Sequence, residues 1–248
     1  MKPGKSSFGR CGSGDPKLIT VYGLECIQKA DVIAYDRLVN PELLNYAKED
    51  AELVYCGKSP GKHHLIQNEI HELLVEKALQ GKNVTRLKGG DPFVFGAGAV
   101  RKRRYWLLTG LNMISSQESQ QESQHRAYAG IPVTHREHAS SYAIVTGHGR
   151  DYKGQDNLNW QALAQGIDTI AFYMGIGNMP FICEKLMEHG RDGKTPVAVI
   201  EWGTTDKQRT ITGTLSSITS KAVKEEIQNP SIFLSRGCRP IKRKNPMV

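Results

Sequence analysis

Short apolar runs alternate with helical stretches along most of this chain, and this alternation constrains the fold more than any other feature. In the first half, β-branched or apolar runs predict strands at 31–35, 53–56 and 83–87. Helical spacing of apolar residues predicts helices at 18–30 and 68–79. Strands that alternate with helices in this way form open, largely parallel sheets.

The second half repeats the pattern and completes the predicted architecture. Its strands are expected at 142–145, 169–173, 196–201, 210–213 and 231–234, and its helices at 160–164, 179–188 and 215–226. A chain of 248 residues accommodates one large domain or two small ones. We expect two α/β domains with mostly parallel sheets, 1–125 and 126–248, and ligands in such folds bind beyond the carboxyl ends of strands.

Composition excludes several classes of protein. Hydrophobic residues make up 39% and charged residues 23%, which is ordinary for a soluble globular protein and unlike disordered or fibrous chains. No apolar run is long enough to span a membrane, and the first residues lack a signal-peptide core, so we expect a cytoplasmic protein. The cysteines are odd in number and scattered, which predicts free thiols and no zinc site: Cys11, Cys26, Cys56, Cys183 and Cys238.

The net charge of +8 is concentrated in three segments. Residues 1–13, 99–126 and 235–248 together carry +11, so the remainder of the chain carries −3. A basic nucleic-acid-binding module would need these segments to form one face with interleaved aromatic residues. Only three aromatic residues, Phe8, Tyr105 and Trp106, lie within them, so we expect no nucleic-acid partner.

A nicotinamide-binding fold is a further alternative. Gly12 and Gly14 precede the first helix, and Asp36 ends the following strand, as in the dinucleotide fingerprint. However, Lys17 stands where the third glycine is required, and residues 5–10 are too polar for the strand that should come first. These two departures disfavour an oxidoreductase.

The most specific stretch is 87–96, Leu-Lys-Gly-Gly-Asp-Pro-Phe-Val-Phe-Gly, at the end of a predicted strand. It lacks the phosphate-loop pattern, and its glycines, aromatics and carboxylate suit a flat, hydroxylated or cationic ligand. A tight structural turn is the alternative. Residues 172–175 and 201–205 also end strands, and for Met174 considered alone we favour core packing.

Seven motifs, in one order, resemble those of the tetrapyrrole methylases, and among them the enzymes that methylate uroporphyrinogen III. They are G-D-P-x-L-I-T (14–20), Y-D-R-L-V (35–39), G-K (57–58), R-L-K-G-G-D-P-F-V-F-G (86–96), A-Y-A-G-I-P-V-T-H-R (127–136), F-Y-M-G (172–175) and E-W-G-T-T-x-x-Q-R (201–209). The order of the seven motifs carries the resemblance, because each motif alone is weak.

The resemblance implies a homodimeric two-domain enzyme with S-adenosyl-L-methionine in the cleft between its domains. Two methyl groups would pass to carbons of uroporphyrinogen III, giving precorrin-2 for sirohaem or cobalamin synthesis. Methylation of another precorrin intermediate is the alternative. Because an electron-rich ring carbon attacks the sulfonium methyl group, alignment of the two reactants would supply much of the acceleration, and a base would then remove a ring proton.

The same resemblance implies catalytic roles for two residues. Asp36 matches the proton acceptor and Lys58 the proton donor. Each also has a simpler interpretation, since Asp36 could cap the segment that follows it. Lys58, like Arg86 and Arg209, could merely attract the carboxylates of the substrate.

The implied cofactor contacts come from both halves. Ser13 stands where the family has a proline, and the other matching positions are Gly89, Gly90, Asp91, Val94, Met174 and Gly203.

Three segments depart from the family pattern: 1–13, 97–126 and 235–248. They lack the apolar first strand, the P-G-[IV]-T cofactor loop and the final V-G-E-V-V strand. Gln117–Gln124 equals P-G-I-T-T-G-I-A read one nucleotide out of frame for a suitable choice of codons. We therefore interpret the segments as frameshifted, and a chain of the printed sequence is predicted to be a catalytically impaired member of the family.

Overall fold

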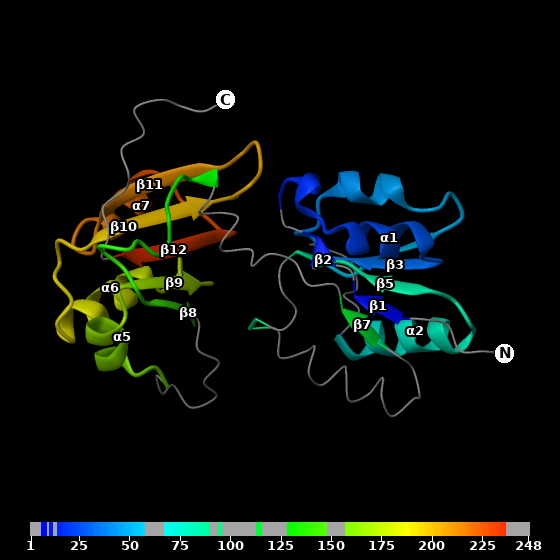
Figure 1. Cartoon of the computed structure of the whole chain (residues 1–248), viewed down its shortest axis with the longest axis horizontal. Coiled ribbons are helices and arrows are strands. Elements are labelled where there is room, and N and C mark those ends of the chain that lie inside the picture. Colours follow the sequence, from blue (N-terminus) through cyan, green and yellow to red (C-terminus); the bar gives the residue numbers. More distant parts are fainter. Residues whose placement is uncertain are drawn as a thin grey trace. The chain divides into compact units, whose positions relative to one another are not determined.

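The computed structural model describes residues 6–8, 10–11, 14–57, 67–89, 94–95, 113–115, 128–147 and 157–236. The chain divides into two compact units, Met1–Gln121 and Glu122–Val248, which are drawn in Figure 1. The domain boundary expected near residue 125 falls within 116–127, outside the described residues, and stays a prediction.

The first unit is built on a parallel sheet. Its strands are β1 (Ser6–Phe8), β3 (Val32–Tyr35), β4 (Glu52–Tyr55), β5 (Val84–Arg86) and β7 (Met113–Ser115). They pair in the order β4-β3-β5-β1-β7, and all four pairings are parallel. Two further strands, β2 (Arg10–Cys11) and β6 (Lys88–Gly89), pair with each other just beyond β1 and β5.

Helices cover both faces of this sheet, as Figure 1 shows. On one face, α2 (Gln67–Leu79) buries apolar side chains against β3 and β5. On the other, α1 (Val21–Lys29) and the 3-10 helix η2 (Pro41–Tyr46) pack around Ile33. The α1 helix begins later than the sequence predicts, after the 3-10 turn η1 (Pro16–Leu18), because the Gly23 N–H donates to the Thr20 hydroxyl at 3.0 Å and caps it.

Two strands lie in segments where the sequence predicts none. β1 occupies part of the polar stretch 5–10, and β7 lies inside the segment 97–126. Residues 5–10 contain no apolar strand, as expected, but the structure places the short polar strand β1 among them. Backbone hydrogen bonds to neighbouring strands on both sides define β1, and such pairing outweighs the weak strand preference of its side chains.

The second unit contains a mixed five-stranded sheet. Its strands are β8 (Tyr142–Thr146), β9 (Thr169–Tyr173), β10 (Pro196–Glu201), β11 (Arg209–Thr214) and β12 (Ser231–Arg236). They lie in the order β11-β10-β12-β9-β8, and only β8 and β9 pair in parallel.

This sheet differs from the mostly parallel one that we expected. The loop 202–208 is too short for a parallel crossover, so β11 returns antiparallel to β10. Helix α7 (Ile218–Lys224) then carries the chain over to β12, which lies antiparallel to both β9 and β10. The predicted α/β class nevertheless holds in both units.

Three helices bury one face of the second sheet. They are α5 (Trp160–Gly166), α6 (Met179–Glu188) and α7, and their apolar side chains surround Phe172 and Phe233. On the opposite face, Ile131 packs against Ala171 and Ile200. Among the described residues, no helix combines the length and the apolarity that crossing a membrane requires.

Candidate functional site

The first unit gathers several predicted site residues at one edge of its sheet. Because the strands are parallel, their carboxyl ends share that edge. Asp36 follows β3, Gly57 follows β4, and Leu87 to Gly89 continue β5. The loops after β1 and β5 stay together beyond the sheet, where Arg10 pairs with Lys88 and Cys11 with Gly89.

Close contacts join the loops after β3 and β5. A Cβ atom placed on Gly89 would lie 2.5 Å from the Leu38 Cβ and 3.0 Å from the Leu38 carbonyl oxygen. The Leu38 N–H in turn donates to Asp36 Oδ1 at 3.1 Å, which fixes the turn after β3. Glycine at 89 therefore allows the two loops to touch.

The loop before α1 joins the same assembly. The Asn40 Nδ2 donates to the Gly14 carbonyl oxygen at 2.7 Å, and the Asn40 Oδ1 accepts from the Glu42 N–H to cap η2. Three loops that are distant in sequence are thus held together, which is the arrangement that a ligand site at strand ends requires.

Three charged groups meet in this region. Burial lowers the pKa of Lys88, the neighbouring Arg86 lowers it further, and the nearby Asp36 carboxylate opposes both effects. Arg86 itself is only 5% exposed. This combination of a carboxylate with one buried and one half-buried cation suits a ligand that carries negative charge.

Four predicted site residues, Ser13, Lys58, Gly90 and Asp91, lie outside the described residues. Val94 is described and half-buried. The next residue, Phe95, is 43% exposed and adopts a left-handed backbone with φ 52°. An exposed aromatic residue in that conformation is uncommon and marks a functional position better than a structural turn.

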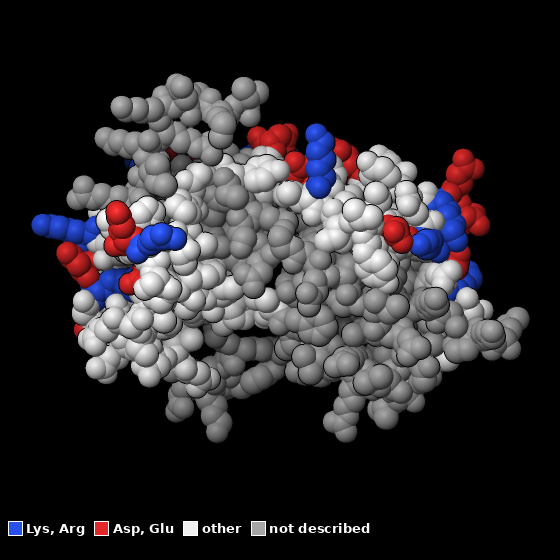
Figure 2. Space-filling model, viewed as in Figure 1, with Lys and Arg blue, Asp and Glu red and all other residues white. Residues whose placement is uncertain are grey.

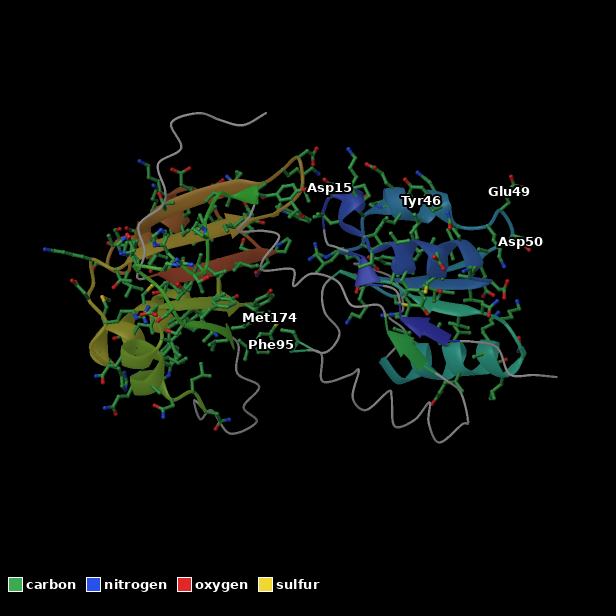
Figure 3. All side chains as sticks on the ribbon, viewed as in Figure 1. Asp15, Tyr46, Glu49, Asp50, Phe95 and Met174 are labelled. Carbon is green, nitrogen blue, oxygen red and sulfur yellow. The ribbon has the colours of Figure 1, made fainter. Side chains whose placement is uncertain are left out.

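The second unit presents its own predicted residues at one sheet edge. β8, β9 and β10 all run in the same direction, so Gly147, Met174 and Gly203 follow their carboxyl ends. Figure 3 shows Met174 just beyond β9. Its side chain is 51% exposed, so core packing is the wrong interpretation of this residue.

The backbone around these residues is strained. Met174, Trp202 and Thr204 have φ values of 53°, 47° and 67°. Left-handed conformations are unfavourable for residues with a Cβ atom, and they persist where surrounding contacts enforce them, often in ligand sites. Both predicted cofactor contacts of this unit, Met174 and Gly203, lie within or beside these strained turns.

Contacts within the motif 201–209 hold the turn after β10. Glu201 is 3% exposed, and its Oε2 accepts from Arg209 Nε at 2.7 Å and from Nη2 at 2.5 Å. The Gln208 Oε1 accepts from the Thr204 N–H at 2.8 Å, and the Thr205 hydroxyl donates to the Trp202 carbonyl. Arg209 is therefore occupied with Glu201 instead of standing open to a substrate carboxylate.

A further glycine contact, which the motifs did not indicate, shapes this edge. A Cβ atom on Gly147 would lie 2.4 Å from the Gly175 Cα, and the Gly147 carbonyl accepts from Asn178 Nδ2 at 2.8 Å. Gly175 ends the motif F-Y-M-G, but Gly147 lies in none of the motifs, so the sequence did not indicate the contact between the two glycines.

One group of possible metal ligands was also missed. His135, Glu137 and His138 present ligand atoms within 4.8 Å of one another, in a turn closed by a bridge between His135 and Ala139. Their order, H-x-E-H, was the available signal. Glu137 and His138 are exposed, and the Glu137 N–H donates to His135 Nδ1, so the turn accounts for part of the arrangement.

Surface charge adds little to the nucleic-acid interpretation. On the face shown in Figure 2, basic and acidic side chains of the described residues lie interleaved. The segments that carry the excess positive charge fall almost wholly outside the described residues.

Both units carry glycine-containing loops at the carboxyl ends of their strands, an arrangement that is typical of α/β enzymes that bind ligands there. Residues 11–102 and 123–219 match the model of the tetrapyrrole (corrin/porphyrin) methylases. The chain belongs to this family, and the resemblance that its motifs indicated is confirmed. The match is interrupted at 103–122, inside the segment 97–126 that lacks the family pattern.

Individual relatives agree with the family. The chain is 50% identical over 231 residues to a uroporphyrinogen-III C-methyltransferase of Priestia megaterium, covering 93% of this chain and 96% of that protein. It is 44% identical over 230 residues to a siroheme synthase of Pseudomonas aeruginosa strain UCBPP-PA14, covering 90% of this chain but only 47% of that longer protein.

A solved structure shares the fold. The crystal structure of a uroporphyrin-III C-methyltransferase from Thermus thermophilus, complexed with S-adenosylhomocysteine, superposes with a TM-score of 0.76. It is 30% identical, and the match covers 94% of this chain and 97% of that chain.

Proposed function

We propose that this chain transfers methyl groups from S-adenosyl-L-methionine to two ring carbons of uroporphyrinogen III, giving precorrin-2. The observation that carries the proposal is the 50% identity to a uroporphyrinogen-III C-methyltransferase across nearly the whole of both chains. The product would feed sirohaem or cobalamin synthesis, and the siroheme synthase relative supports the first route.

The described loops offer backbone groups that a methyl donor could contact. Gly89 leaves its backbone open beside Leu38, and the strained turns at Met174 and Gly203 present backbone groups at strand ends. We propose these three residues, with Ser13, Gly90, Asp91 and Val94, as the cofactor contacts. When bound, S-adenosyl-L-methionine supplies an electrophilic methyl group on a sulfonium sulfur.

Asp36 is proposed as the proton acceptor. Its Oδ1 accepts from the Leu38 N–H, and no described residue has a recorded hydrogen bond to its Oδ2. A carboxylate fixed in this way can take a ring proton once the new carbon–carbon bond has formed. Lys58, which follows Gly57 in the sequence, is proposed as the proton donor.

The proposed reaction also requires groups that bind and orient the substrate. Uroporphyrinogen III carries many carboxylates, and the cations Arg86 and Lys88 near Asp36 would hold such a substrate with its ring carbon facing the methyl group. We further propose a homodimer in the cytoplasm.

The test is turnover by the purified chain under anaerobic conditions. Mass spectrometry of the tetrapyrrole product should show the addition of two methyl groups, with formation of an equal amount of S-adenosylhomocysteine per transfer. A folded chain that binds S-adenosylhomocysteine but methylates a different precorrin would replace the substrate and leave the reaction class in place.

A catalytically impaired enzyme is the second candidate. The specific observation in its favour is the interruption of the family match at 103–122. The assay separates the two, because an impaired chain would bind S-adenosylhomocysteine yet turn over far more slowly than the Priestia megaterium relative assayed beside it.

A further inference from the structure

Arg86 is a buried cation with two side-chain nitrogen atoms that have no partner among the described residues. It is the last residue of β5 and is 5% exposed. Its Nε and Nη1 atoms are inaccessible to water, and no described residue accepts a hydrogen bond from either of them. Leaving a guanidinium in this state is strongly unfavourable unless a ligand completes it.

Two other arginines have hydrogen-bond partners among the described residues. Arg191 donates to four carbonyl groups, those of Leu163, Ala164, Ile167 and Asp168, and to the Ser235 hydroxyl. Arg209 binds the buried Glu201 with two of its nitrogen atoms. The unpaired state of Arg86 is therefore not a general property of arginines in this fold.

The position of Arg86 places it at the proposed active site. Arg86 pairs in register with Ala34 of β3, and Asp36 follows Ala34 by two residues, which puts Asp36 and Arg86 on the same face. The charges of Asp36 and Arg86 both influence the pKa of Lys88, which lies two residues beyond Arg86. The three groups are therefore electrostatic neighbours at the carboxyl edge of the sheet.

The chemistry of these groups selects the kind of ligand. A guanidinium with unpaired N–H donors, reinforced by a second, half-buried cation, binds carboxylates through charge-assisted hydrogen bonds. Both proposed substrates carry suitable groups, since uroporphyrinogen III has acetate and propionate side chains and S-adenosyl-L-methionine has an α-carboxylate.

We propose that Arg86, with Lys88 beside it, forms an internal carboxylate-binding subsite that receives one carboxylate of a substrate. The inference rests on the proposed function, because it takes the two ligands from that function. It assigns Arg86 a direct ligand contact, in place of a general attraction for anions at the surface.

The test compares Arg86→Gln and Arg86→Lys with the wild-type chain. Lys29→Gln is the matched control, because it removes one positive charge from an exposed helix position of the same unit. Two binding constants are measured, for uroporphyrin III by fluorescence quenching and for S-adenosylhomocysteine by calorimetry. Thermal unfolding without ligand is recorded for every variant.

We expect Arg86→Gln to weaken binding of one ligand by about 10- to 100-fold, the loss typical of a charged hydrogen bond, and to leave the other within twofold. Arg86→Lys should restore part of that loss, and Lys29→Gln should change neither constant. The unfolding temperature of Arg86→Gln should not fall, because the substitution removes a buried charge whose Nε and Nη1 have no partner among the described residues.

Each outcome decides a point. A loss confined to uroporphyrin III assigns the subsite to the tetrapyrrole, and a loss confined to S-adenosylhomocysteine assigns it to the methyl donor. Equal affinities in wild type and Arg86→Gln would overturn the subsite while leaving the proposed function standing, as would loss of both ligands with a lowered unfolding temperature. A wild-type chain that binds neither ligand would overturn the proposed function itself.

Discussion

Gly89 and Leu38 approach so closely that a single methyl group would not fit between them. The nearest approach of a Cβ at position 89 would be 2.5 Å to the Leu38 Cβ, with the Leu38 backbone at 3.0 Å. Leu38 also carries the N–H that binds Asp36, so this contact connects a proposed cofactor residue to the proposed proton acceptor.

Gly89→Ala is therefore expected to push apart the loops after β3 and β5. Overpacking of this kind costs about 1–3 kcal/mol of folding free energy, and S-adenosylhomocysteine affinity should fall with it. Gly166→Ala is the control, because no atom lies within 4 Å of a Cβ at that position. Denaturant unfolding and calorimetry measure both effects, and equal behaviour of the two variants would contradict the close contact.

Asp36→Asn should lower turnover by about 100-fold or more, since an amide cannot accept the ring proton. The amide oxygen can still accept the Leu38 N–H, so the turn and S-adenosylhomocysteine binding should persist. Asp50→Asn, at an exposed position, serves as the control for loss of one carboxylate. Unchanged turnover in Asp36→Asn would transfer the role of base to another group.

The pair of Glu201 and Arg209 gives a stability prediction. Arg209→Met leaves a carboxylate that is 3% exposed with only the Gln228 N–H as a recorded partner. We expect a loss of about 2 kcal/mol of folding free energy, because a buried charge without its counter-ion is costly. Adding Glu201→Gln should recover part of the loss, and a double variant that is less stable than Arg209→Met would contradict the explanation. Urea unfolding is the measurement.

Asp31 makes the stability of the first unit depend on pH in the acidic range. Its pKa is lowered by hydrogen bonds from Lys48 Nζ at 2.6 Å and from the Asn83 N–H at 2.7 Å. A lowered folded-state pKa means that the stabilisation is present above the unfolded value, about 3.9 for aspartate, and is lost as the pH falls through the folded value.

Asp31→Asn should therefore lower the unfolding temperature near neutral pH. The difference from wild type should shrink as the pH approaches 3, since protonation removes the same interaction from the wild-type chain. Lys48→Met tests the contribution of the exposed ion pair alone and should have a smaller effect. A difference that stays constant from pH 7 to pH 3 would exclude Asp31 as the titrating group.

Sequence patterns predicted those elements whose own residues carry the signal. Strands 169–173 and 196–201 and helix 179–188 were placed with the bounds that the structure has, because each is a strongly apolar or amphipathic run. The strand at Ser6–Phe8 was not predictable in this way. Its side chains carry no strand pattern, and only pairing with β5 and β7 defines it.

The candidate site divides in the same manner. Asp36, Gly89 and Gly203 were found because they stand in motifs at the ends of predicted strands. The unpaired donors of Arg86 and the left-handed backbone of Met174 depend on contacts from other parts of the fold, so no local pattern could indicate them. The motifs therefore located the loops. Burial and backbone geometry then identified the residues in them that have unpaired donors or a strained backbone.

Met174 has a strained backbone, which lowers folding stability, and a proposed contact with the cofactor, which raises affinity. A left-handed conformation costs a residue with a Cβ atom about 1–2 kcal/mol, and glycine adopts it without that cost. The unfolding temperature of Met174→Gly should therefore be at least as high as that of wild type. Little packing is lost, because Met174 is half exposed and contributes little to the core. The same variant should bind S-adenosylhomocysteine more weakly, because the contact proposed for the methionine side chain is gone. Met179→Ala is the contrasting substitution, since Met179 is buried in the core of the same unit and its truncation should cost stability. Thermal unfolding and calorimetry on both variants separate the two effects, and a Met174→Gly chain that loses stability while keeping full affinity would show that Met174 is retained for packing.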